Sequence, residues 1–191
     1  MDNFDHLPTS ERIQTTFQDV VAYGLRPEAV SGATDAQIDD MAAAQDAPAV
    51  PAAVREVLRL IGDDQGPFLG GGCFFGVDEL REDVKETALE FYDMVSPQPA
   101  EFRAPADMLV LLFHGGYQVC VIDGADLNDP NPPVWLLEED GELSQLWSTV
   151  TEWFSGVCAE VKRLADALGD MRAQNQPEVA WARHFRGGGA S

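Results

Sequence analysis

The sequence predicts an α+β fold in which a mostly antiparallel sheet is flanked by helices, with one added N-terminal helix. Two observations support this prediction. Between residues 108 and 147, four short apolar runs come in two close pairs, each joined by a glycine-containing turn, which is typical of β-hairpins. On both sides of this region, apolar residues recur at the spacing of amphipathic helices.

The first pair of runs predicts two neighbouring strands near the centre of the sheet. Met108–Phe113 contains no polar residue, as expected for a strand that is covered on both faces. His114 and a Gly-Gly pair break this run, and we expect the His114 side chain to bond backbone in the turn. Tyr117–Ile122 then resumes as an antiparallel strand.

The second pair of runs predicts another hairpin. Val134–Glu138 and Glu142–Trp147 flank the tripeptide Glu139-Asp140-Gly141. Because Asp-Gly between strand-like segments is a strong turn signal, these runs should pair with each other. Trp135 and Trp147 are then expected to be core residues, or partner anchors if they face outward.

A long amphipathic helix should follow the second hairpin. Thr149 and Glu152 have the spacing of a capping box, and apolar residues, including the core candidate Trp153, then repeat at helical intervals. We expect Gly169 to end this helix. Residues 169–191 are more polar and are expected to form a partly flexible tail.

The N-terminal half is predicted to be helical. Residues 1–29 should form an arm whose helix, from about Thr9 to Tyr23, docks its apolar face on the main domain, residues 30–168. Within that domain, Thr34 and Pro51 are placed to start two successive helices. A further amphipathic helix is expected between residues 79 and 94, after a glycine-rich loop.

The order of these features resembles one known family. The segment from Gly32 to Gly62 is similar to the N-terminal helical region of the SUKH superfamily, the Smi/Knr-type proteins. Phe113–Gln118, the proline-rich Asp129–Trp135 and the ending Trp147–Phe154 then follow in that family's order, so the resemblance covers roughly residues 30 to 158. It implies an α+β domain with a sheet of roughly six strands and no catalytic centre.

The resemblance also implies a mode of action. In bacteria such proteins serve chiefly as immunity proteins that bind and neutralise a polymorphic toxin, often a nuclease, and a fungal relative acts as a regulatory scaffold. Composition agrees with a single globular domain, since the chain has 191 residues of which 45% are hydrophobic. An acidic N-terminus and the lack of a membrane-length apolar run predict a cytoplasmic protein.

Cysteine and histidine usage does not predict a metal, a cofactor or a disulfide. Cys73, Cys120 and Cys158 are odd in number and far apart, and two of them lie in apolar segments, so free buried thiols are expected. The Gly70-Gly71-Gly72 loop lacks the lysine and spacing of a P-loop. His114 has no Gly-x-Ser-x-Gly partner motif for acyl chemistry.

Charge is the strongest guide to a partner. Acidic residues number 33 against 12 basic ones, giving a net charge of −21, so nucleic acid is not expected as a ligand and a basic protein is. A solvated, solubilising surface is the ordinary explanation for any one acidic cluster. Two clusters are nevertheless proposed as the contact surface: Asp78, Glu79, Glu82 and Asp83, and the hairpin residues Glu138, Glu139, Asp140 and Glu142.

These observations together predict a non-enzymatic, acidic binding protein. The first hypothesis is an immunity protein that neutralises a toxin of the same bacterium by tight complexation. Two alternatives stay open: an interaction scaffold that recruits housekeeping proteins, and an enzyme with a diffuse active site, which no motif supports.

Overall fold

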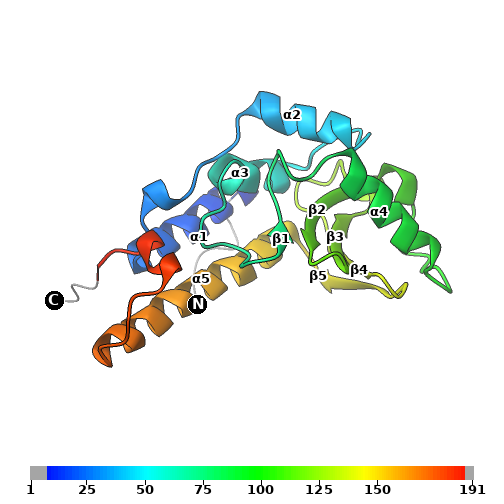
Figure 1. Ribbon diagram of the computed structural model, residues 1–191. Helices are drawn as coiled ribbons and strands as arrows, with labels where there is room; N and C mark the ends of the chain where they lie inside the picture. Colours follow the sequence, from blue (N-terminus) through cyan, green and yellow to red (C-terminus); the bar gives the residue numbers. More distant parts are fainter. Residues whose placement is uncertain (1–7, 188–191) are drawn as a thin grey trace.

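The computed structural model describes residues 8–187, including every side chain in that range except that of Glu82. This part of the chain forms five α-helices and one five-stranded sheet, which confirms the α+β prediction (Figure 1). The helices are α1 (Thr9–Tyr23), α2 (Asp35–Ala44), α3 (Ala52–Ile61), α4 (Glu82–Asp93) and α5 (Val150–Ala173). The strands are β1 (Cys73–Phe74), β2 (Leu109–His114), β3 (Gln118–Ile122), β4 (Val134–Glu138) and β5 (Leu143–Trp147).

The sheet is an antiparallel meander with the spatial order β1-β2-β3-β4-β5. Both predicted hairpins are present, as β2–β3 and β4–β5. Strand β1 was missed because it has only two residues and directly follows three glycines. The family resemblance implied roughly six strands, whereas the described residues form five.

The two faces of the sheet have different covers. Side chains alternate along a strand, so Leu112 and Cys120, which lie opposite each other in the register, share one face with the helix α5 above them. Trp135 points to the other face. It contacts Phe102 edge-on, and Phe102 contacts Tyr92 of α4, so α4 covers this second face.

The helical half of the molecule is held together by stacked aromatic rings. Phe17 of α1 stacks on Phe68 with ring centroids 6.1 Å apart, and Phe68 stacks on Phe154 of α5 at 6.3 Å. Phe68 and Phe154 are fully buried. The predicted N-terminal helix is therefore present and docks through its apolar face on α3 and α5.

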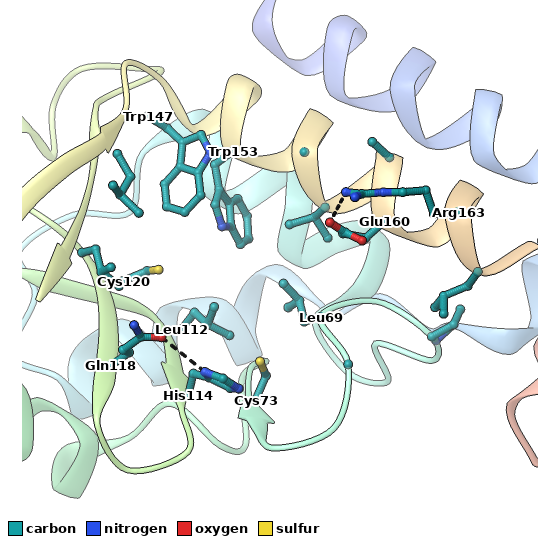
Figure 2. Close-up of a pocket in the computed structure, with 18 residues that line it drawn as sticks. Leu69, Cys73, Leu112, His114, Gln118, Cys120, Trp147, Trp153, Glu160 and Arg163 are labelled. Carbon is teal, nitrogen blue, oxygen red and sulfur yellow. Dashed lines mark hydrogen bonds and ion pairs between the residues drawn. The ribbon is translucent and has the colours of Figure 1, made fainter. Parts of the chain in front are cut away.

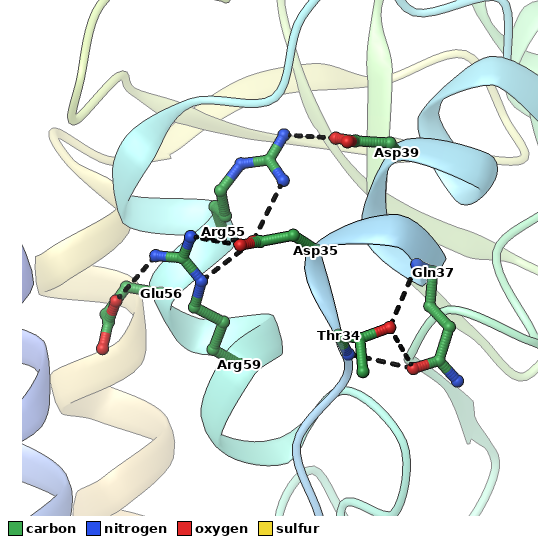
Figure 3. Close-up of polar contacts among 7 residues, drawn as sticks. All are labelled: Thr34, Asp35, Gln37, Asp39, Arg55, Glu56 and Arg59. Atoms are coloured by element: carbon green, nitrogen blue, oxygen red, sulfur yellow. Dashed lines mark hydrogen bonds and ion pairs between the residues drawn. The ribbon is translucent and has the colours of Figure 1, made fainter.

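Helices α2 and α3 are joined by a surface ion-pair network (Figure 3). Thr34 caps α2 in a complete capping box with Gln37. Asp35 in the first turn accepts hydrogen bonds from the guanidinium of Arg59, which holds the pKa of that carboxyl below its usual value. Arg55 bonds Asp39 one turn further along α2.

Helix α5 continues through Gly169 and ends at Ala173, so the predicted stop was wrong. The true stop is Asn175, which adopts a left-handed φ of 53° and donates its backbone N–H to Arg172 O, while the N–H of Gln176 bonds Met171 O. Beyond it, Phe185 is buried and pairs with Leu25 near the end of α1. Residues 188–191 of the expected flexible tail lie outside the described residues.

Candidate functional site

The outward face of α4 carries a continuous row of carboxylates. Asp83, Glu86, Glu90 and Asp93, hereafter the acidic stripe, are all exposed. Their spacing of three, four and three residues keeps them within about 80° of arc on an α-helix. The buried positions of the same helix, such as Ala88 and Phe91, face the sheet. The stripe therefore points to solvent over its whole length.

The first predicted cluster lies at the N-terminal end of this stripe. Asp78 and Glu79 are exposed in the segment that leads into α4, and Asp83 is the first member of the stripe. Asp78 pairs with Arg81 at 3.5 Å. Glu82 begins α4, and its side chain lies outside the described part of the structure.

The second predicted cluster lies at the C-terminal end of α4. In the β4–β5 turn, the backbone N–H of Glu138 bonds Glu142 O at 2.9 Å, and Gly141 takes a left-handed φ of 81°. An added Cβ at Gly141 would lie 2.5 Å from the carbonyl oxygen of Met94, the residue that caps α4. The exposed side chains of Glu139, Asp140 and Glu142 are thus held next to the end of the stripe.

Glu138 differs from the other three hairpin carboxylates. Its Oε1 accepts a hydrogen bond from Nε2 of Gln118 at 2.7 Å, and the residue is half-buried. Gln118 lies on the face of the sheet away from α4. Glu138 therefore turns toward that face, whereas its neighbours project from the turn.

The two predicted clusters do not touch each other. They lie at opposite ends of α4, which at 12 residues is about 18 Å long. The stripe connects them through Glu86, Glu90 and Asp93, three residues that were not among the predicted contacts. Their signal was available in the sequence, because acidic residues three and four apart share one face of a helix.

A pocket of about 770 Å³ lies between α5 and the face of the sheet away from α4 (Figure 2). Its lining is mainly apolar and includes Trp153, which is buried as predicted, and the half-buried Trp147. Trp135 is also buried, on the α4 side, and does not serve as an outward anchor. The sequence did not predict the pocket, because it depends on how α5 crosses the sheet.

Polar groups gather at one end of this pocket. The expected bond from His114 to backbone was wrong: Nδ1 of its ring lies 3.4 Å from Oε1 of Gln118. Cys73 and Cys120 line the same end as free thiols. Burial raises the pKa of Cys73, and it raises that of Cys120 to about 12, so both thiols stay protonated at neutral pH.

The described residues contain no group of three or more His, Cys, Asp or Glu side chains arranged to hold a metal ion. In residues 8–187, no helix is long and apolar enough to span a membrane.

The meander sheet, with α5 on one face and the acidic helix α4 on the other, defines a single-domain α+β protein with a charged outer face. The sequence model of the SMI1/KNR4 family (SUKH-1) matches residues 32–156. The chain belongs to this family, which confirms the resemblance drawn from its motifs. Family membership is consistent with an immunity or a scaffold protein and implies a protein-binding role; such proteins are generally not enzymes. No curated protein and no solved structure matches the chain.

Proposed function

We propose that this protein is a bacterial immunity protein that acts in the cytoplasm and neutralises a cognate toxin by tight complexation, without a catalytic step. The observation that supports it best is the acidic stripe together with the two clusters at its ends. They form one acidic surface, which is composed of Asp78, Glu79, Asp83, Glu86, Glu90, Asp93, Glu139, Asp140 and Glu142. The predicted contact Glu138 is not part of it, because its carboxylate bonds Gln118 on the other face of the sheet.

The stripe is costly for the isolated protein. Like charges three or four residues apart on a helix destabilise it by about 0.2–0.5 kcal/mol per pair. Asp93 also stands near the C-terminal, negative end of the helix dipole, where an acidic side chain is unfavourable. The one basic residue within α4, Lys85, is buried on the opposite side. Cations of a partner would relieve this repulsion, so the surface is suited to a basic protein.

The charge also suits rapid capture. A net charge of −21 attracts a basic surface over long range and increases the association rate. Met94 is 51% exposed between the stripe and the hairpin turn, where it offers an adaptable apolar contact within the acidic surface. A nuclease whose basic substrate groove is covered by this surface would lose access to nucleic acid.

A regulatory scaffold is the second candidate, because the same family membership and the same surface serve it equally well. The two functions differ in their partners. An immunity protein has one tight partner whose toxicity it suppresses, whereas a scaffold has several partners of weaker affinity.

Affinity capture from lysate of the source bacterium, washed at low and then at high salt and read by mass spectrometry, separates these functions. We expect one dominant basic partner whose production stops the growth of cells. Co-expression of the wild-type protein should restore the growth of those cells. A broad set of partners that salt releases, with no growth defect to rescue, would favour the scaffold and contradict immunity.

A further inference from the structure

The pocket between α5 and the sheet lies on the opposite side of the sheet from the acidic stripe. Leu112 and Cys120 form part of its floor, whereas Trp135 faces α4. At about 770 Å³, its volume falls in the range of roughly 300–1,000 Å³ that is typical of small-molecule sites. A protein bound to the stripe would leave it accessible.

One wall of the pocket is built by an irregularity in β5. Val134 pairs with Trp147 and Trp135 pairs with Gln145, so Leu146 is an extra residue in β5. Such a bulge directs two consecutive side chains to one face of a sheet. Leu146 and Trp147 accordingly both line the pocket, and Leu146 is 48% exposed although it is apolar. This exposed apolar wall would gain from being covered.

The opposite wall is formed by α5 and carries no side chain at Gly156. Gly156 lies inside this helix, where glycine costs about 1 kcal/mol relative to alanine. A Cβ added at Gly156 would meet no atom of the described residues within 4 Å, because it would project into open space. Trp153 and Val157 flank this gap and supply apolar contacts on either side.

The polar end of the pocket presents a hydrogen-bond acceptor. The side-chain N–H of Gln118 donates a hydrogen bond to Glu138. The amide oxygen of Gln118 therefore faces Nδ1 of His114. That oxygen can only accept, so the 3.4 Å contact is a hydrogen bond in the tautomer whose proton is on Nδ1. In that neutral tautomer Nε2 is the acceptor, and it lies on the side of Gly72, whose added Cβ would be 3.9 Å from it.

Charge excludes several classes of ligand. The thiols of Cys73 and Cys120 are neutral, and Glu160 and Arg163 at the edge of the pocket are paired with each other. A charged ligand would lose hydration here without gaining an opposite charge. Anions are also repelled by the net charge of −21.

We propose that this pocket binds a neutral, largely apolar small molecule that carries one hydroxyl or N–H donor, and that Nε2 of His114 accepts this donor. The apolar body of the ligand lies between the Leu146–Trp147 wall and the Gly156 side of α5. This site is separate from the acidic surface of the proposed function, and it holds whether the protein is an immunity protein or a scaffold.

Two α5 variants provide a matched test. Gly156→Leu fills the pocket from a position that has room for the side chain. Gly169→Leu makes the same replacement in the same helix at an exposed glycine that also has no described atom within 4 Å of an added Cβ. Both changes should raise helix stability, which circular dichroism melting checks. Only the first should affect a ligand.

The probe is N-phenyl-1-naphthylamine, a neutral aromatic amine with one N–H whose fluorescence rises in apolar surroundings. We expect saturable binding of the probe to the wild type and to Gly169→Leu. Its affinity for Gly156→Leu should be weaker than for the wild type by roughly tenfold or more. The probe should slow alkylation of Cys73, and its N-methylated form, which lacks the donor, should bind the wild type more weakly.

Equal binding to both variants, or no saturable binding to the wild type, would overturn the proposal. Equal affinity for the N-methylated probe would remove His114 from it. Capture of the protein partner provides a further arm: if Gly156→Leu abolishes that capture, the pocket belongs to the protein interface and is not a small-molecule site. Retained capture with lost probe binding is the result that we expect.

Discussion

Replacement of Phe17 by alanine tests whether α1 is part of the core. This helix lies outside the residues matched by the family, 32–156, and could be mistaken for a dispensable arm. Phe17 is only 6% exposed and stacks on Phe68, which is itself fully buried against Phe154. The substitution therefore removes one member of a stack that joins α1 to α5.

The expected cost follows from the burial of this ring. Transferring a buried phenylalanine to water costs about 1.5–3 kcal/mol, and the cavity that remains raises the total for Phe→Ala to about 3–5 kcal/mol. In a chain of 191 residues, each kcal/mol corresponds to roughly 2–4 °C, so the melting temperature should fall by roughly 6–20 °C.

Urea unfolding followed by tryptophan fluorescence measures this change, because Trp153 is buried in the core. Phe74→Ala is the matched control, since Phe74 is 46% exposed and should cost less than about 1 kcal/mol. If Phe17→Ala destabilised the protein no more than Phe74→Ala, α1 would not be part of the cooperative core.

Three further predictions concern buried and paired groups. Asp123 is fully buried and accepts hydrogen bonds from the backbone N–H groups of Arg103 and Ala104 at 2.8 Å. Asp123→Ala should therefore lower the free energy of unfolding, measured in urea, by about 2–5 kcal/mol. Asp123→Asn keeps an acceptor and should lower it less, and equal losses for the two variants would contradict this role of Asp123. Arg59 lowers the folded-state pKa of Asp35, so the stabilising effect of this pair is present above the unfolded pKa of 3.8 and is lost as pH falls through the folded pKa. The difference in stability between the wild type and Asp35→Asn should therefore shrink in acid. A difference that does not change with pH would refute the pairing. Alkylation with iodoacetamide should modify the half-buried Cys73 first, while the two buried cysteines react only after unfolding, which peptide mass spectrometry will show.

Local patterns were sufficient to predict most of the fold. The apolar run Met108–Phe113, the Asp-Gly turn and the periodicity of α1 each depend on residues close in the chain, and all three appear in the structure. Strand β1 failed because two residues carry no periodicity. The end of α5 was misplaced because Gly169 lies inside a long helix that tolerates it. Leu168, the residue before Gly169, is buried and helps to hold this part of the helix.

The candidate site was predictable only in part. Both acidic clusters were visible as runs of charge, but their relation depends on the contact between Gly141 and Met94, which are far apart in the sequence. The sequence did not predict that Glu138 accepts a hydrogen bond from Gln118, since Gln118 is on a neighbouring strand. The pocket needs α5 and the sheet together, and the sequence supplies no local signal for it.

The acidic surface is proposed to bind a basic partner. The most direct test of this binding measures the affinity of the captured partner for two variants of equal net charge, at low and at high salt. One neutralises the acidic stripe (Asp83→Asn, Glu86→Gln, Glu90→Gln and Asp93→Asn), and the other neutralises four exposed carboxylates elsewhere (Glu11→Gln, Asp19→Asn, Asp40→Asn and Asp170→Asn).

We expect the stripe variant to bind roughly tenfold or more weakly than the wild type at low salt, mainly through a slower association rate, and to lose most of its salt dependence. The second variant should bind nearly as the wild type does. If both variants lose affinity equally, net charge alone explains the binding; if neither loses affinity, the acidic surface is not the interface.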